Sequence, residues 1–274
     1  MSDAMRAIIA AANERNSTVD GDYVQDGLLY CGKCHTPKQC RPEIGGKVIT
    51  FGCLCKCAEE EREKHEAEAK AEEHRQYIES LRVQGIQDRA VSNYTFANAE
   101  PTAMLEKCRI YADRFSTALE GGNGLLFWGG IGNGKTFTAA CIANALIDKG
   151  VPVLVTSFPH IINADMNARQ DMISQIRNFD LLVLDDLGVE RQSEFALETV
   201  YTVIDERYKQ RKPLIVTTNL PLAELQNPKD ISCARIYDRL LEMCAPVRFD
   251  GQSVRAKKAA DNMDAIKRIF ADGD

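Results

Sequence analysis

The chain has 274 residues, of which 45% are hydrophobic and 27% are charged, and its formal net charge is −6 at pH 7. These values are ordinary for a globular protein and exclude a generally basic nucleic-acid-binding chain, while a local basic groove between subunits stays compatible with them. The sequence has no apolar run near the ~20 residues of a membrane span, and its start lacks the features of a signal peptide. We therefore expect a cytoplasmic protein with no membrane partner, built from one α/β domain and a smaller attachment.

The N-terminal part begins with a predicted helix over residues 3–15 and continues into a cysteine cluster. Six of the ten cysteines lie between Cys31 and Cys57. In a cytosolic chain, cysteines at this density predict metal binding before disulfides. A strand predicted over residues 47–51 leads from the first half of the cluster back to the second half.

The spacing of the clustered cysteines predicts a zinc site. Four thiolates suffice to bind Zn²⁺ in a tetrahedron, and a module this small would take its folding free energy from the metal because it cannot bury a useful core. The alternatives to zinc are free surface cysteines or an iron–sulfur cluster. We favour as zinc ligands Cys31, Cys34, Cys55 and Cys57. Possible substitutes in this ligand set are His35, Cys40 and Cys53.

Residues 58–82 are rich in Glu, Lys, Arg and Ala and contain no Pro or Gly. This composition predicts a solvated helix that acts as a spacer, and it disfavours a nucleic-acid-binding arm because acidic residues outnumber basic ones. The chain is therefore expected to divide into an N-terminal helix and zinc-binding module (1–57), a charged helical spacer (58–93) and an ATPase domain (94–274).

The last of these regions alternates between helical and apolar strand-like segments, beginning with a helix predicted over residues 105–119. Short apolar runs that alternate with helices indicate an α/β fold, with a parallel sheet covered by helices on both faces. Five strands are predicted, over residues 125–128, 153–156, 181–184, 214–218 and 247–249.

A glycine-rich loop follows the first of these strands and has the Walker A spacing G-x-x-x-x-G-K-[ST]. The strand before it and a helix predicted over residues 137–149 provide the context that this motif requires; the alternative is a chance glycine-rich turn. The glycines let backbone N–H groups turn toward phosphate oxygens, and the helix N-terminus adds partial positive charge. Lys135 would reach the β- and γ-phosphates of ATP, and the Thr136 hydroxyl would bind Mg²⁺. We assign nucleotide binding to Gly129, Gly130, Ile131, Gly132, Asn133, Gly134, Lys135, Thr136 and Phe137.

Polar residues follow the third and fourth predicted strands. Asp185 and Asp186 form a Walker B element, in which we expect Asp185 to hold Mg²⁺ and Asp186 to orient the attacking water. Paired acids at a strand end can instead cap a helix. Asn219 ends the fourth strand, from where its amide could contact the γ-phosphate or the water; alone, it would be an ordinary turn residue.

Three arginines complete the candidate set. Arg235 and Arg239 are four residues apart and share one face of a helix, from which an arginine could reach the γ-phosphate of a neighbouring subunit. The alternative is a solvated helix face with Asp238 and Glu242 nearby. Arg255 follows the fifth strand and could fold back onto the nucleotide of its own subunit.

With these motifs, the chain from about Tyr94 to Lys258 resembles the DnaC/DnaI-type replicative helicase loaders, a branch of the AAA+ ATPases, and most of all their phage and prophage members. The cysteine module is similar to the zinc-binding N-terminal domain of DnaI-like loaders, which IstB-like transposition helpers usually lack. The resemblance rests on the P-loop and on the segments Asp180–Gly188, Arg207–Leu220, Arg235–Leu240 and Ser253–Arg255.

The resemblance implies an oligomer with ATP at subunit interfaces. It implies Asn219 as sensor 1, Arg239 as the arginine finger supported by Arg235, and Arg255 as sensor 2. It also implies that the N-terminal module grips the replicative helicase hexamer and places it on single-stranded DNA. One departure bears on Arg255: about 25 residues follow the fifth strand, too few for a full AAA+ helical lid.

Three functions follow from this interpretation. The leading one is an ATP-hydrolysing helicase loader with ATP, Mg and Zn as cofactors. The second is an IstB-like transposition helper ATPase, which the cysteine module disfavours. The third is a P-loop kinase for a small substrate, which would need an acceptor site and a lid that the sequence does not clearly offer.

Overall fold

The computed structural model describes residues 18–44, 46–86, 88–188, 193–250 and 253–271. It divides the chain into two compact units, residues 1–75 and 76–274, with the boundary inside the helix α2 (Lys56–Gly85). The helix predicted over residues 3–15 lies outside the described residues. The three-part division of the chain stays a prediction.

The first unit is built from short antiparallel pairs: β1 with β2, β3 with β6, and β4 with β5. The prediction of a single strand over residues 47–51 is wrong. The start of this stretch pairs with β4, whereas its end pairs with β3. Between β5 and β6, the Ile49 N–H donates to the carbonyl of Pro42 at 3.2 Å. The strands are β1 (Tyr23–Gln25), β2 (Leu28–Tyr30), β3 (Gln39–Cys40), β4 (Glu43–Ile44), β5 (Lys47–Val48) and β6 (Phe51–Gly52).

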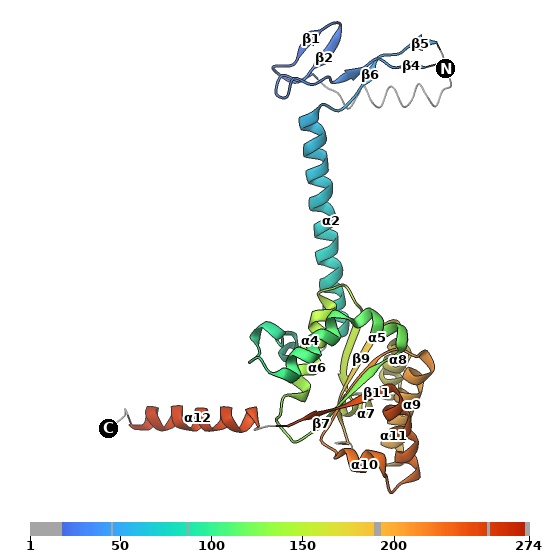
Figure 1. Cartoon of the computed structure of the whole chain (residues 1–274), viewed down its shortest axis with the longest axis vertical. Coiled ribbons are helices and arrows are strands. Elements are labelled where there is room, and N and C mark those ends of the chain that lie inside the picture. Colours follow the sequence, from blue (N-terminus) through green and yellow to red (C-terminus); the bar gives the residue numbers. More distant parts are fainter. Residues whose placement is uncertain (1–17, 45, 87, 189–192, 251–252, 272–274) are drawn as a thin grey trace. The chain divides into compact units, whose positions relative to one another are not determined.

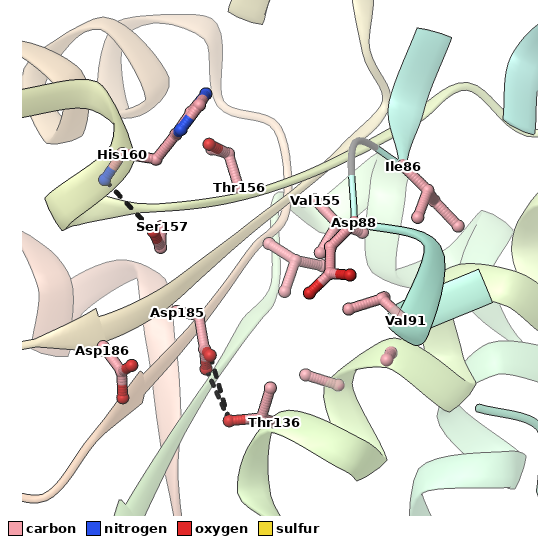
Figure 2. Close-up of a pocket in the computed structure, with 13 residues that line it drawn as sticks. Ile86, Asp88, Val91, Thr136, Val155, Thr156, Ser157, His160, Asp185 and Asp186 are labelled. Atoms are coloured by element: carbon pink, nitrogen blue, oxygen red, sulfur yellow. Dashed lines mark hydrogen bonds between the residues drawn. The ribbon is translucent and has the colours of Figure 1, made fainter. Parts of the chain in front are cut away.

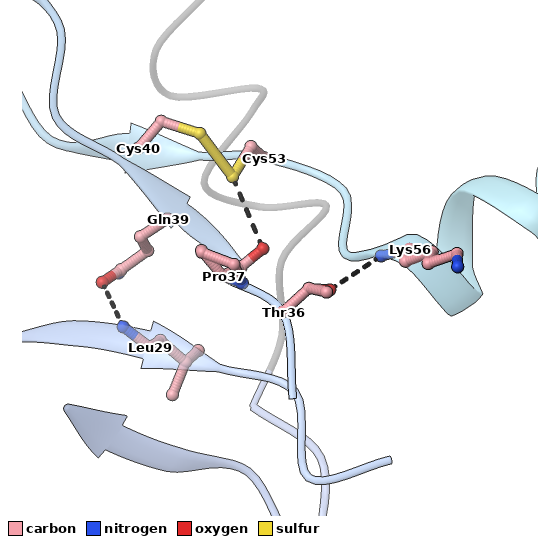
Figure 3. Close-up of a disulfide and its surroundings, with 7 residues drawn as sticks. All are labelled: Leu29, Thr36, Pro37, Gln39, Cys40, Cys53 and Lys56. Atoms are coloured by element: carbon pink, nitrogen blue, oxygen red, sulfur yellow. Dashed lines mark hydrogen bonds between the residues drawn. A yellow bond between two sulfur atoms is a disulfide. The ribbon is translucent and has the colours of Figure 1, made fainter. Parts of the chain in front are cut away.

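A disulfide joins Cys40 to Cys53 within this unit, so the preference for metal binding over disulfides is wrong for these two of the six clustered cysteines (Figure 3). The antiparallel register places Cys40 opposite Phe51, and the Cys53 N–H donates to the Lys38 carbonyl at 2.8 Å. The two cysteines are thus bonded to each other and do not substitute in the zinc ligand set. The spacing of the cysteines in the sequence could not distinguish this pair from the four favoured zinc ligands, because it is the strand register that brings Cys40 and Cys53 together.

Helix α2 confirms the helix predicted over residues 58–82 and extends it at both ends. Pairs of opposite charge at i and i+4 run along its exposed surface, as in Arg62–Glu66 and Lys64–Glu68. The helix ends at Gly85, where a Cβ would lie 1.9 Å from the carbonyl oxygen of Val153, so only glycine fits.

The second unit contains a five-stranded parallel sheet in the order β11-β7-β10-β9-β8, which confirms all five predicted strands. Sequence-adjacent strands are joined by helical crossovers, as a parallel sheet requires. The strands are β7 (Gly124–Gly129), β8 (Val153–Ser157), β9 (Leu181–Leu187), β10 (Leu214–Thr218) and β11 (Cys244–Phe249).

Helices cover both faces of this sheet (Figure 1). Alternate strand residues point to opposite faces. Phe127 and Val183 belong to the core cluster with α4 (Ala103–Asp113), α5 (Phe115–Gly121) and α6 (Lys135–Ile147). Leu126 and Leu184 belong to the cluster with α7 (Phe158–Asn163), α9 (Glu194–Gln210) and α11 (Ile231–Met243). The fold is therefore the covered α/β sheet that the sequence pattern predicts.

Two predicted helices differ in their bounds. The helix predicted over residues 105–119 is broken at Arg114, and the residue after the break, Phe115, is buried in the core at 4% exposure. The helix after the glycine loop begins two residues earlier than predicted, because Gly134 adopts φ +88° and α6 starts directly at Lys135.

A single helix, α12 (Val254–Ala271), follows β11 among the described residues. None of the helices within those described segments is both long and apolar enough to cross a bilayer. The helices of the second unit after α2 are α3 (Arg89–Ser92), the 3₁₀ turn η1 (Phe96–Asn98), α4 (Ala103–Asp113), α5 (Phe115–Gly121), α6 (Lys135–Ile147), α7 (Phe158–Asn163), α8 (Met166–Gln175), the 3₁₀ turn η2 (Ile176–Asn178), α9 (Glu194–Gln210), α10 (Leu222–Gln226), α11 (Ile231–Met243) and α12 (Val254–Ala271).

Candidate nucleotide site and cysteine cluster

The glycine loop between β7 and α6 has the backbone that a phosphate cradle needs. Gly129, Gly132 and Gly134 have φ values of +134°, +82° and +88°, which residues with a Cβ rarely adopt. A Cβ on Gly129 would also lie 2.3 Å from the carbonyl oxygen of Phe249. Since α6 starts at Lys135, the unpaired N–H groups of its first turn lie at the end of this loop.

Lys135 is held at the centre of the loop. Its ammonium group donates to the carbonyls of Gly129 (2.9 Å) and Gly130 (2.7 Å) and to Oδ1 of Asn219 (2.8 Å). Burial lowers the pKa of Lys135, and the nearby carboxylates Asp186 and Asp185 oppose this shift. The structure therefore brings Lys135 together with Asn219, a polar residue from the end of a different strand.

The two acids lie beside the loop, at the end of β9. The Thr136 hydroxyl contacts both carboxylate oxygens of Asp185, at 2.9 and 3.1 Å (Figure 2). This hydroxyl and this carboxylate are the oxygen ligands predicted for Mg²⁺, and they are of the type that this hard cation prefers. Asp186 has φ +60°, and burial, followed by the charge of Asp185, raises the pKa of its carboxyl group.

Thr217 is a site residue that the sequence reasoning missed. Its hydroxyl contacts Oδ1 of Asp185 and accepts the N–H of Asp186 at 3.1 Å. The signal that could have revealed it is the pair of hydroxyl residues Thr217 and Thr218 directly before Asn219, at the end of a buried strand.

A cavity of about 350 Å³ adjoins the acids, between α6, α7, β8 and the segment after α2 (Figure 2). Thr136, Asp185 and Asp186 form one side of it. The Thr156 hydroxyl belongs to its lining and is buried, with no hydrogen-bond partner among the described residues. Sequence reasoning did not identify this cavity, because its lining comes from segments far apart in the chain.

The start of α12 lies against the loop. A Cβ built on Gly132 would lie 2.1 Å from the Ser253 hydroxyl and 3.6 Å from Cβ of Arg255. The Asn133 side-chain amide donates to the Phe249 carbonyl at 3.2 Å, which joins the loop to the end of β11. Arg255 is thus near the loop of its own chain, with an exposed side chain.

Arg239 contacts α9. Its Nη2 lies 3.0 Å from Oδ1 of Asp205, and its guanidinium carbon lies 4.7 Å from the ring centre of Tyr201 and 5.6 Å from that of Tyr208. Its Nη1 atom is buried, and none of the residues that the structure describes offers it a hydrogen-bond partner. Arg235, one turn earlier on α11, is exposed. Arg239 therefore belongs neither to the loop of its own chain nor to a fully solvated helix face.

The four favoured cysteines form one cluster in the first unit. Their sulfur atoms all lie within 4.8 Å of one another, and Cys31 and Cys55 are buried. The Thr36 hydroxyl, 3.1 Å from Sγ of Cys34, is the main cause that lowers the pKa of Cys34 to about 5. Four converging thiols fit a tetrahedral zinc ion in number and chemistry. His35, the remaining alternative, instead contacts the Tyr23 ring at 5.8 Å between ring centres.

We expect the purified protein to carry about one zinc ion per chain, the number that one four-thiolate site holds. Replacing Cys31 by serine, or removing the metal with a chelator, should unfold the first unit and leave the second folded, because the metal supplies the folding free energy of a module this small. Elemental analysis gives the metal content, and limited proteolysis reports each unit. Cys233, which is only partly buried in α11, provides a control for the loss of a thiol. A protein that holds neither zinc nor iron would refute this prediction.

The parallel sheet, the glycine loop, the paired acids and the asparagine after the neighbouring strand define a P-loop ATP-binding protein with the AAA+ type of α/β core. The chain belongs to the family of IstB-like ATP binding proteins, whose model matches residues 63–262. It is 30% identical over 149 residues to the replicative helicase loader DnaI of Bacillus subtilis, and the aligned segment covers 49% of this chain and 48% of that protein. It is 27% identical over 143 residues to the replicative helicase loader DnaC of Escherichia coli K12, which covers 50% of this chain and 56% of the relative.

The chain thus spans about half the length of the curated relatives it matches. Among solved structures, that of DnaI aligns with a TM-score of 0.51 and 23% identity, over 61% of this chain and 96% of the DnaI chain. At this level of identity, the structural likeness concerns the fold alone.

Proposed function

We propose that this protein is an ATP-hydrolysing loader that grips a replicative helicase hexamer and places it on single-stranded DNA. The observation that carries the proposal is the four-thiol cluster, present in a separate unit ahead of a P-loop core. The similarity of that core to the helicase loaders of two bacteria supports it.

In this proposal, five residues of the second unit carry out hydrolysis. Lys135 binds the β- and γ-phosphates of ATP, and it exchanges its contacts with the loop carbonyls for phosphate oxygens. The Thr136 hydroxyl and Asp185 hold Mg²⁺, which supplies charge neutralisation at the phosphates when bound. Asp186 takes the proton of the attacking water, and its raised pKa suits a base. Asn219 orients the water or the γ-phosphate from its position beside Lys135.

Arginines complete the site across subunit interfaces. We propose that the protein forms a homo-oligomer in which Arg239 enters the site of a neighbour, with Arg235 supporting it, and that Arg255 contacts the nucleotide of its own chain. The exposed side chains of Arg235 and Arg255 are compatible with these roles. Arg239 would have to leave Asp205 and the two tyrosine rings, an exchange that can be tested by mixing variants.

The alternative function is that of a transposition helper ATPase, and the family to which the chain belongs favours it. Both functions use the same ATPase chemistry, so the partner distinguishes them. The cysteine cluster favours the loader, because it provides a second folded surface for a protein partner.

The test is size-exclusion chromatography with light scattering on the full-length protein mixed with the replicative helicase of its host, with and without ATP. The loader proposal predicts a stable complex of higher mass whose composition depends on ATP. A Lys135→Ala variant serves as the control for the nucleotide effect. If the helicase elutes alone at micromolar concentrations in both conditions, and a transposase is bound instead, the transposition function replaces the loader.

Replacing Asp186 by asparagine should leave ATP binding largely intact and slow hydrolysis by roughly 10²–10⁴-fold, the usual contribution of a general base. The amide keeps the size of the side chain but cannot accept the proton. Steady-state phosphate release and equilibrium binding of ATP separate the two effects. Asp180→Asn, at an acid just before β9 that pairs with Lys212 at 2.9 Å, provides a control outside the site. Turnover at the parent rate would remove Asp186 from the mechanism.

A further inference from the structure

We propose that Thr217 is a positioning residue that sets the direction of the metal-binding carboxylate Asp185 through its hydroxyl group. This inference rests on the proposed function, because it concerns how the site holds Mg²⁺ with ATP. It assigns a role to a residue outside the loop, the paired acids and the arginines.

Thr217 lies on β10, the strand next to β9, and its side chain is fully buried at 0% exposure. Its hydroxyl contacts Oδ1 of Asp185 and lies 3.1 Å from the backbone nitrogen of Asp186. The direction of both bonds is fixed by chemistry, because a carboxylate only accepts and a backbone N–H only donates. The Thr217 hydroxyl therefore gives its single proton to Asp185 and accepts the N–H of Asp186.

The strand register explains why a hydroxyl is needed here. Val216 is opposite Leu184 and Thr218 is opposite Leu187, so two residues of β9, Asp185 and Asp186, face the single residue Thr217. Two residues on one strand opposite a single residue on the next is the arrangement of a β-bulge, a feature that redirects side chains and is frequent next to active sites. The bulge removes the Asp186 N–H from the regular ladder, and the Thr217 side chain supplies the acceptor that the backbone no longer provides.

Asp186 at this bulge adopts φ +60°, an uncommon backbone conformation for a residue with a Cβ. The bond from its N–H to Thr217 helps to hold that conformation. The Thr217 hydroxyl thus holds both the side chain of Asp185 and the backbone of Asp186.

A second hydroxyl, that of Thr136, also contacts Asp185. Thr136 is itself a proposed ligand of the metal, whereas Thr217 lies on the neighbouring strand β10 and is buried. Thr217 can therefore keep its bond to Asp185 while the metal is held. Groups that orient metal ligands in this way commonly contribute about 10–100-fold to metal affinity or activity.

The test replaces Thr217 by valine, which has the same shape but no hydroxyl. The affinity for ATP is measured by calorimetry with Mg²⁺ and with EDTA, and the Mg²⁺ concentration for half-maximal ATPase activity is measured separately. We expect Thr217→Val to bind ATP in EDTA with the affinity of the parent. The increase in ATP affinity on adding Mg²⁺ should be roughly 10–100-fold smaller than in the parent. The Mg²⁺ concentration for half-maximal ATPase activity should rise correspondingly. Thr217→Ser, which keeps the hydroxyl, should restore the parent values.

Thr218→Val is the matched control, since Thr218 is also fully buried and also uses its hydroxyl twice. That hydroxyl donates to the Leu187 carbonyl at 2.8 Å and accepts the Leu220 N–H at 3.1 Å, so both of its bonds in the described part of the chain are to backbone groups. We expect this variant to unfold at a lower temperature but to keep the parent response to Mg²⁺. Thermal unfolding checks that each variant is folded, and Thr217→Ala is a second hydroxyl-free variant if valine is not tolerated.

The outcomes separate this inference from the proposed function. An unchanged response to Mg²⁺ in the hydroxyl-free variants overturns the role of Thr217, as does an equal loss in Thr218→Val. A parent protein that binds ATP no better with Mg²⁺ than with EDTA and does not hydrolyse it overturns the proposed function itself.

Discussion

Replacing Lys135 by alanine should abolish ATP hydrolysis and strongly weaken nucleotide binding. The ammonium group lies at the centre of the glycine loop, in contact with two loop carbonyls and Asn219. Among the described residues around the loop, Lys135 is the lysine that reaches this position, so its charge has no substitute there. Equilibrium ATP binding and phosphate release measure the two effects separately.

The same substitution also removes three hydrogen bonds, and a loss of folding has to be distinguished from a loss of chemistry. Lys135→Met retains most of the side-chain volume and removes the ammonium group with its charge and its three hydrogen bonds. We expect it to remain folded and still be inactive, which would assign the loss to the ammonium group and not to a cavity. Lys149→Ala is the matched control: this lysine lies just beyond the end of α6 and pairs with Asp113 at 2.7 Å, away from the loop. Hydrolysis by Lys135→Ala at the parent rate would show that the nucleotide site has been assigned to the wrong residues.

The parts of the structure that could be predicted from the sequence depend on local patterns. Each strand of the parallel sheet is a short apolar run, and such runs are buried on both faces in a sheet of this type. The loop from Gly129 to Thr136 has a spacing that fixes its own backbone, and the carboxyl ends of parallel strands meet at one edge of the sheet. These facts together place Lys135, Asp185 and Asn219 near one another before any coordinates are known.

The features that could not be predicted depend on register or on contacts between distant segments. Thr217 acquires its contacts through a bulge that shifts β10 against β9. The hydroxyl pair Thr217–Thr218 marks this strand end in the sequence, but it does not show which of the two residues the bulge places opposite the acids. Cys40 and Cys53 pair because β3 lies against β6, although their spacing also fits a metal site. The surroundings of Arg239 come from α9, more than thirty residues earlier, and the helical pattern of α11 gives no information about that neighbour.

Replacing Arg239 by alanine should make the protein nearly inactive, since an arginine supplied by a neighbouring subunit can contribute on the order of 10³–10⁵ to the rate of hydrolysis. The contacts of Arg239 with α9 also give it a structural role, so folding must be measured beside activity. Asp205 retains its ion pair with Lys209 at 2.7 Å when Arg239 is removed, so the substitution does not leave that carboxylate unpaired. We therefore expect Arg239→Ala to remain folded.

A matched variant separates the structural from the catalytic contribution of Arg239. Asp205→Asn weakens the ion pair on the α9 side but keeps the guanidinium group, so its activity should be far higher than that of Arg239→Ala. Comparable losses of activity in the two variants, with comparable decreases in thermal stability, would indicate that Arg239 acts by holding α11 against α9.

Mixing two inactive variants tests whether the active site is shared. Lys135→Ala damages the face of the interface that binds ATP, and Arg239→Ala damages the face that supplies the arginine. In a mixture, some interfaces combine an intact Lys135 with an intact Arg239, so activity should return in part and should rise with protein concentration as assembly is favoured. Subunit exchange must be established independently, for instance by energy transfer between labelled subunits. If the subunits exchange and the mixture stays inactive at every ratio, Arg239 does not act on a neighbour, and its contacts with Asp205 and Tyr201 become its whole role.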